Sequence, residues 1–245
     1  MYAIMTRHLY ETVPYAQAFE ALGLEVIAMP VTRTEPPRDA GALTRAIEAG
    51  GHSAILVASP RAALALLGAR GHASLFDVWA VGPATAQVLA EAGISAFVPE
   101  PAKDAAAAAH AMLAALPLAG KRVLIPRAEG GRDEAIEILR AAGVDVDPID
   151  AYRTAAIERD DPEVVRGRDA LVAGEVALCA VFAPSQVAAL EAIVGIRSVT
   201  TRWIAIGETT AAALREAGAE VISVATEPTP EGIANAAAAV YPAPR

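Results

Sequence analysis

Hydroxyl-bearing residues recur where a short apolar segment of this chain gives way to an alanine-rich one. Such turns carry free backbone N–H groups and the positive end of a helix dipole, and both favour anions. A hydroxyl at the turn adds a further hydrogen-bond donor. The pattern predicts a binding site for a ligand with several anionic groups, formed by Ser59, Gly82, Thr85, Ser185, Thr210 and Thr229.

Helix capping alone selects the same residue types. Serine and threonine stabilise the N-cap position and proline suits the first helical position, as in Ser59-Pro60 and Thr229-Pro230. For any single turn, capping without ligand contact therefore remains open. The repetition of the pattern along the chain favours the ligand.

A tyrosine supplies a candidate proton donor. Tyr152 lies in an extended polar stretch, 150–160. A phenol can donate a proton to a leaving oxygen while its ring packs against an apolar ligand. The alternative is that Tyr152 only packs this stretch against the body of the protein.

Two arginines stand directly after predicted strands. Arg7 follows the strand at 2–6, and Arg127 follows the strand at 122–125. Each can form charge-assisted hydrogen bonds with a carboxylate, or serve only as a surface charge. The loop 129–133, which contains two glycines, can hold an anion on its backbone but is a weak phosphate-loop signal.

Several other chemistries have no support in the sequence. The chain contains no G-x-x-x-x-G-K-[ST], G-x-G-x-x-G, G-x-S-x-G or H-E-x-x-H motif. Its one cysteine, Cys179, cannot form an internal disulfide or a multi-cysteine zinc site, and its four histidines lack ligand spacing. We therefore expect no metal site and a reducing cytoplasm.

The charge argues against two kinds of partner. A net charge of −9 is unfavourable for binding nucleic acid or an anionic membrane surface. The N-terminus shows no signal peptide, and the longest apolar run, 105–119, is too short and too rich in alanine to span a bilayer.

The elements that must position these residues alternate along the chain. β-branched runs without strict alternation predict strands buried on both faces, and alanine- and leucine-rich runs between them predict helices. This alternation predicts an α/β fold with parallel sheets. The predicted strands are 2–6, 25–29, 54–58, 79–82, 122–125, 144–149, 176–182, 203–207 and 220–224.

The chain also contains an internal duplication. Segment 22–34 matches 142–154 at an offset of 120 residues, and 81–93 matches 206–218 at an offset of 125. Ser59 and Ser185 match at an offset of 126. Chance similarity of alanine-rich helices does not explain the matching strand-to-helix turns. The duplication predicts two similar α/β lobes.

The boundary between the lobes does not fall at the midpoint. The polar stretches 30–37 and 150–160 occupy equivalent places in the repeats, and paired prolines keep the first one extended. If the two stretches pair, they form a two-stranded connector. Lobe A then comprises 1–33 and 155–245, and lobe B comprises 34–154.

Six motifs in this order resemble the uroporphyrinogen-III synthase family over essentially the whole chain. They are VASPRAA, AVGPATA, DAYRT, VFAPSQ, IAIGETTAAALREAG and EPTPEGI. The resemblance implies two small parallel α/β lobes joined by a two-stranded connector. It also implies a cofactor-free lyase that closes hydroxymethylbilane, a linear tetrapyrrole polycarboxylate, to uroporphyrinogen III. A cleft built within one chain needs no second subunit, so we expect a monomer.

The resemblance also suggests a role for each candidate residue. Tyr152 occupies the position of the family's connector tyrosine and would assist departure of the hydroxyl group. Ser59, Thr85, Ser185, Thr210 and Thr229 occupy turn positions that would bind carboxylates, with Gly82, Arg7 and Arg127 beside them. The alternative function is a non-catalytic anion-binding or sensory module of two lobes. A nucleotide-sugar transferase is disfavoured by the short chain.

Overall fold

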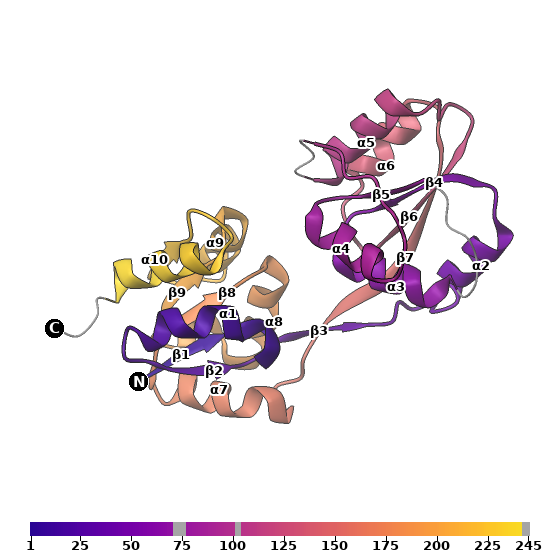
Figure 1. Ribbon diagram of the computed structural model, residues 1–245. Helices are drawn as coiled ribbons and strands as arrows, with labels where there is room; N and C mark the ends of the chain where they lie inside the picture. The colour runs from indigo at the N-terminus through magenta and orange to yellow at the C-terminus, as the bar shows by residue number, and fades with distance from the viewer. Residues whose placement is uncertain (71–76, 101–103, 242–245) are drawn as a thin grey trace. The chain divides into compact units, whose positions relative to one another are not determined.

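The computed structural model describes residues 1–70, 77–100 and 104–241. The chain divides into two compact units (Figure 1). The first unit comprises Met1–Arg33 and Ala155–Arg245, and the second comprises Thr34–Thr154. One unit is therefore built from both ends of the chain, whereas the other is continuous in sequence.

The first unit contains a five-stranded sheet in the order β10-β9-β8-β1-β2, in which all four neighbouring pairs are parallel. Its strands are β1 (Tyr2–Met5), β2 (Glu25–Ala28), β8 (Val176–Val181), β9 (Arg202–Ala205) and β10 (Ile222–Val224). Two helices pack on one face: α1 (Leu9–Glu20) and α10 (Pro230–Val240). Three pack on the other: α7 (Pro162–Val172), α8 (Pro184–Val194) and α9 (Glu208–Glu216).

The second unit contains a five-stranded sheet in the order β3-β7-β6-β4-β5. Its strands are β3 (Thr32–Glu35), β4 (His52–Val57), β5 (Val78–Ala80), β6 (Arg122–Ala128) and β7 (Asp145–Ala156). One face carries α5 (Ala105–Ala115) and α6 (Glu134–Ala141). The other carries α2 (Ala42–Ala49), α3 (Pro60–Ala69) and α4 (Pro83–Glu91). The boundaries between the units fall within β3 and β7.

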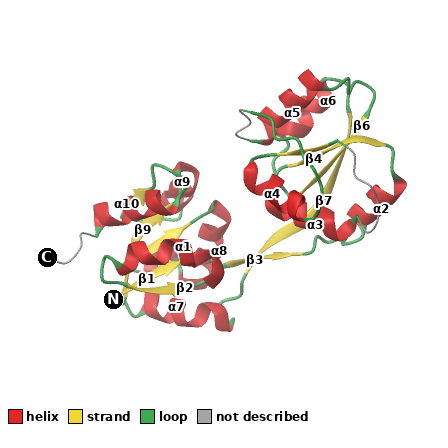
Figure 2. Cartoon of the chain, in the orientation of Figure 1, coloured by secondary structure: helices red, strands yellow, loops and turns green. Residues whose placement is uncertain are grey.

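Each sheet is buried on both faces, which explains its uninterrupted apolar strands. In β4, Ala54 and Leu56 join the apolar cluster under α5 and α6, whereas Ile55 and Val57 join the cluster under α3 and α4. Figure 2 shows helices on both sides of the strands. The predicted α/β fold class, with two mostly parallel sheets flanked by helices, is confirmed.

The two sheets share one plan, as the internal repeats predict. β1 and β2 of the first unit correspond to β6 and β7 of the second, and β8 and β9 correspond to β4 and β5. The matched glycines Gly23 and Gly143 both follow a helix and have φ values of 75° and 78°. This left-handed backbone suits glycine, so the same residue ends a helix at the same place in each repeat.

The strands that carry the candidate site are longer than predicted. β6 continues to Ala128 and β7 to Ala156. Pairing of β6 with β4 ends at Leu124, whereas pairing with β7 continues to Ala128. Pro126, which has no N–H to donate, is tolerated in β6 because one side of the strand is open there.

Candidate active site

The candidate active site lies in the second unit, where β4 leads into α3. Ser59 has extended backbone at the N-cap of α3, and its Oγ accepts a hydrogen bond from the N–H of Ala62 at 3.1 Å. Pro60 follows as the first helical residue and fixes its own φ without leaving a free N–H. The local sequence therefore places the Ser59 hydroxyl at the carboxyl end of the sheet.

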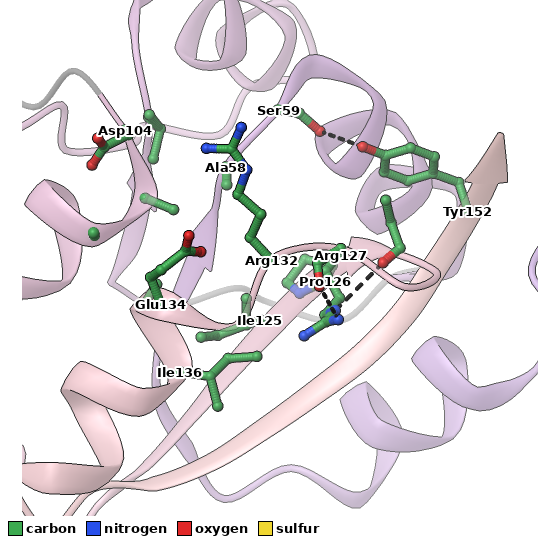
Figure 3. A pocket seen from close by; sticks show the side chains of 16 residues that line it. Ala58, Ser59, Asp104, Ile125, Pro126, Arg127, Arg132, Glu134, Ile136 and Tyr152 are labelled. Atoms are coloured by element: carbon green, nitrogen blue, oxygen red, sulfur yellow. Dashed lines mark hydrogen bonds between the residues drawn. The ribbon is translucent and has the colours of Figure 1, made fainter. Parts of the chain in front are cut away.

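Tyr152 brings its hydroxyl to the same point from β7. Ser59 Oγ and Tyr152 Oη lie 3.1 Å apart, and either atom can be the donor (Figure 3). The tyrosine ring is partly buried against the apolar cluster under α3 and α4. Ser59 already accepts from Ala62, so its own proton is available for Tyr152, and the phenol proton is then free to point elsewhere.

A cavity of about 650 Å³ opens beside this pair. Its apolar wall includes Ala58, Val81, Ile125, Pro126 and Ile136. Its polar groups include Ser59, Asp104, Arg127, Arg132, Glu134 and Tyr152. A wall of this kind suits an apolar ring that carries charged substituents.

Arg127 is held by its own loop. The guanidinium pairs with Asp133, donates to the Gly131 carbonyl and lies 3.8 Å from Asp150. Only 17% of the side chain is exposed. Arg127 lies within β6, rather than after it as predicted, because this strand is longer than the apolar run.

Arg132 stands on the same loop but has no hydrogen-bond or ion-pair partner among the described residues. Its side chain is exposed and extends along the cavity towards Ala58 (Figure 3). The sequence placed Arg132 in the loop 129–133, which is a weak signal for a phosphate-binding loop, but did not select Arg132 as a site residue. The available signal was a cation beside two glycines at the carboxyl end of a strand.

In the first unit, a hydroxyl caps the helix at one of the equivalent turns but not at the other. Thr229 caps α10, and its Oγ1 accepts from the N–H of Gly232 at 3.1 Å. Ser185 is exposed in the first turn of α8, but the N-cap of that helix is Ala183. The structural counterpart of Ser59 is therefore Ala183, and the predicted equivalence of Ser59 with Ser185 is wrong by two residues.

Arg7 follows β1 and rests on aromatic rings. Its guanidinium carbon lies 4.1 Å from the ring centroid of Phe182 and 5.5 Å from that of Tyr15. No carboxylate in the described part of the chain pairs with it. Stacking on ring faces leaves the N–H edges of the guanidinium able to bind a carboxylate.

Two of the predicted hydroxyls are not accessible. Thr85 is 1% exposed and Thr210 is 3% exposed, each within the first turns of its helix. Gly82 caps α4 with a φ of 77°, a left-handed conformation that favours glycine. In this conformation the hydroxyls of Thr85 and Thr210 are therefore not available to a ligand.

The described residues provide neither a metal cluster nor a reactive thiol. Among them, no group of three or more His, Cys, Asp or Glu side chains could hold a metal ion. Cys179 is fully buried, and burial raises the pKa of its thiol well above the usual range. No helix in the described ranges has the length and apolar character needed to cross a membrane.

Two α/β units with mostly parallel sheets, one with a cavity that contains arginine and carboxylate side chains at the carboxyl end of its sheet, define the class of α/β proteins that bind a small molecule beside the strand ends. The family model for uroporphyrinogen-III synthase HemD matches residues 13–235. The chain therefore belongs to the uroporphyrinogen-III synthase family, the cyclising lyases of tetrapyrrole biosynthesis.

Solved structures with this family's name share the fold. The synthetase from Helicobacter pylori has a TM-score of 0.65 and 16% identity, over 97% of this chain and 98% of that one. A mutant synthase from the extremely thermophilic bacterium Thermus thermophilus has a TM-score of 0.60 and 22% identity, over 96% of this chain and 97% of that one. A comparison with curated proteins found no match.

Proposed function

We propose that this chain carries out its family's reaction at the cavity beside Tyr152. In that reaction hydroxymethylbilane loses water, its last pyrrole ring is inverted, and the macrocycle closes to uroporphyrinogen III. The observation that supports this location is the Ser59–Tyr152 hydrogen bond beside a cavity that also contains Arg132, an arginine with no partner among the described residues.

The first step is departure of the hydroxyl group. Tyr152 donates its proton to that oxygen, the carbon–oxygen bond breaks, and water leaves. The electron pair of the pyrrole nitrogen stabilises the carbon left behind. The Ser59 hydroxyl then donates to the phenolate, which holds it in place. Proton donation of this kind contributes roughly 10²–10⁴-fold to a rate.

The second step is closure of the ring. A carbon of the last pyrrole attacks the electrophilic carbon, and rearrangement through a spiro intermediate inverts that ring. Loss of a proton from a ring carbon restores the pyrrole, and the phenolate accepts a proton in return. The protein must also hold the two ends of the substrate together, an effect worth about 7–11 kcal/mol in well-oriented systems.

Carboxylate binding is assigned to local donors because the chain as a whole repels a polycarboxylate. At a net charge of −9, long-range attraction is weak. In the first unit we assign this role to Arg7, Ser185 and Thr229. At Gly82, Thr85 and Thr210 the helix N-terminus supplies the backbone donors. Arg127 remains a candidate only if its loop rearranges.

We also place the enzyme in the cytoplasm as a monomer. A single buried thiol needs no oxidising compartment, and the proposed proton donor and its hydrogen-bond partner, Tyr152 and Ser59, belong to the same unit of one chain. Sedimentation of the purified protein tests the monomer directly.

The test is to add hydroxymethylbilane and resolve the type I and type III product isomers. Formation of the type III isomer supports the proposed function. Type I product alone, at the rate seen in buffer, would overturn it and leave a non-catalytic binding module. Tyr152→Phe should lower turnover by roughly 10²-fold or more while leaving the melting temperature unchanged; an unchanged rate removes Tyr152 as the proton donor.

A further inference from the structure

We propose that the cavity of the second unit binds the hydroxymethyl-bearing pyrrole ring, and that Arg132 binds a carboxylate of that ring while Arg127 positions the loop. This inference rests on the proposed function. It assigns the cavity to one ring of the substrate and transfers the carboxylate-binding role from Arg127 to Arg132.

The bonds of Arg127 fit a positioning residue. Its N–H groups are directed to Asp133, to the carbonyls of Gly131 and Ala128, and towards Asp150. A guanidinium has five N–H groups, so these contacts use most of them. The guanidinium is therefore oriented by the loop rather than towards the cavity.

The loop held by Arg127 is also constrained by its own backbone. Gly130 has a φ of 67°, which is left-handed. A Cβ on Gly131 would lie 3.0 Å from the Ala128 carbonyl oxygen. At the start of the loop, the N–H of Glu129 donates to the Tyr152 carbonyl at 2.7 Å. The loop is therefore joined to the strand that carries the proposed proton donor.

Arg132 is the cation that this loop presents to the cavity. It follows Gly131 directly, and in the described part of the chain nothing pairs with its guanidinium. Figure 3 shows the two arginines diverging, with Arg127 turned to the loop backbone and Arg132 extended along the cavity. An unpaired guanidinium can bind a carboxylate through two parallel hydrogen bonds.

The position of Tyr152 selects the ring. A general acid must approach its target oxygen to about 2.6–3.2 Å. Because Tyr152 borders the cavity that contains Arg132, the ring bound there is the one that carries the leaving hydroxyl group. Ile125, Pro126 and Ile136 supply the apolar surface for that ring. The negative charges of Asp104 and Glu134 at the same cavity favour the positive charge that develops as water leaves.

The test compares Arg132→Gln with a matched control. Arg122→Gln removes the same charge from the same unit. Arg122 is the first residue of β6 and therefore lies at the amino end of the strand, away from the loop that carries Arg132. We expect R132Q to raise KM for hydroxymethylbilane roughly tenfold or more without changing the melting temperature. R122Q should leave KM unchanged.

A modified substrate identifies the ring. Esterifying the carboxylates of only the hydroxymethyl-bearing ring should raise KM of the wild-type enzyme by a similar factor. It should have little further effect on R132Q. Esterifying another ring instead should raise KM of wild type and R132Q alike. If R132Q loses affinity equally with every ester, the ring assignment is wrong.

The remaining outcomes separate the two proposals. Wild-type formation of the type III isomer with an unchanged KM in R132Q overturns this inference and leaves the proposed function in place. No type III isomer from the wild type overturns the proposed function itself. If R127Q, but not R132Q, removes the effect on KM of esterifying the hydroxymethyl-bearing ring, Arg127 is the residue that binds the carboxylate of that ring.

Discussion

The two units share the order of four strands but use two arginines at matching places in the repeats, Arg7 and Arg127, differently. In the first unit Arg7 stacks on Phe182 and keeps its N–H edges open, whereas in the second Arg127 is bonded to the loop that follows it. The second unit instead presents Arg132, from a position without an arginine counterpart in the first repeat. A duplicated position therefore predicts where a side chain lies, not what it binds.

The strand-to-helix corners differ in the same way. Ser59 caps α3 and reaches Tyr152 in the second unit. In the first unit, Gln186 ties the corner together instead: its Nε2 donates to the Thr6 carbonyl, and its Oε1 accepts from the Thr6 hydroxyl at 2.7 Å. Gln186 is buried, so this network holds the strand ends together rather than offering groups to a ligand.

The largest expected difference between the units concerns independent folding. Residues 34–154 contain every strand assigned to the second unit except the first two residues of β3 and the last two of β7, so this fragment should fold alone and melt cooperatively. A fragment of residues 1–120 lacks β6 and β7 and should not. Calorimetry of the two fragments checks this, and the reverse result would restore a boundary near the midpoint.

The next largest effect separates the two serines. Ser59→Ala should lower turnover roughly tenfold, because the phenolate loses a hydrogen bond, and should cost about 1 kcal/mol of stability through the lost cap. Asp161→Ala is the control, since Asp161 caps α7 by accepting from the N–H of Glu163 at 3.0 Å. It should lower stability similarly without slowing turnover.

Replacement of Ser185 completes that comparison. Ser185→Ala removes no cap, so its melting temperature should equal that of the wild type. A stability loss as large as that of Ser59→Ala would show that the two corners are equivalent after all.

A smaller effect distinguishes Arg7 from Arg127. Arg7→Gln should raise KM several-fold with little loss of stability, because it removes a carboxylate donor and a cation–π contact worth about 0.5–1 kcal/mol. Arg127→Gln should lower the melting temperature as well, because loss of this partly buried guanidinium leaves Asp133 and the Gly131 carbonyl without their donor. Steady-state kinetics with thermal melts check both variants.

The smallest expected effect concerns Cys179, which lies in β8 of the first unit. Burial raises the pKa of this thiol in the folded state, so the unfolded chain loses its proton first as the pH rises. The contribution of the Cys179 thiol to the free energy of unfolding is fully present below the pKa of the unfolded chain, about 8.5. Above that pH it declines by about 1 kcal/mol per pH unit. Denaturant unfolding of wild type and Cys179→Ala at pH 7 and pH 9.5 should show the extra decline only in the wild type.

Local signals in the sequence were sufficient for most of the fold. The buried strands, the glycine helix ends and the Ser59-Pro60 and Thr229-Pro230 helix starts follow from propensity and capping over a few residues. The length of β6 was not predictable in this way, because Pro126 disfavours a strand unless one side is unpaired, and only the strand order decides that.

By itself, the sequence determined the α/β class, the duplication and the turns at which the candidate site residues stand. These features depend on hydrophobic period, on capping chemistry and on repetition, all of which can be read along the chain. Only the tertiary structure decided that Tyr152 meets Ser59 across 93 positions and that Arg132, rather than Arg127, has no partner within the described ranges. The reason is physical: a hydrogen-bonding group has several possible partners in the sequence, and packing selects which of them it meets.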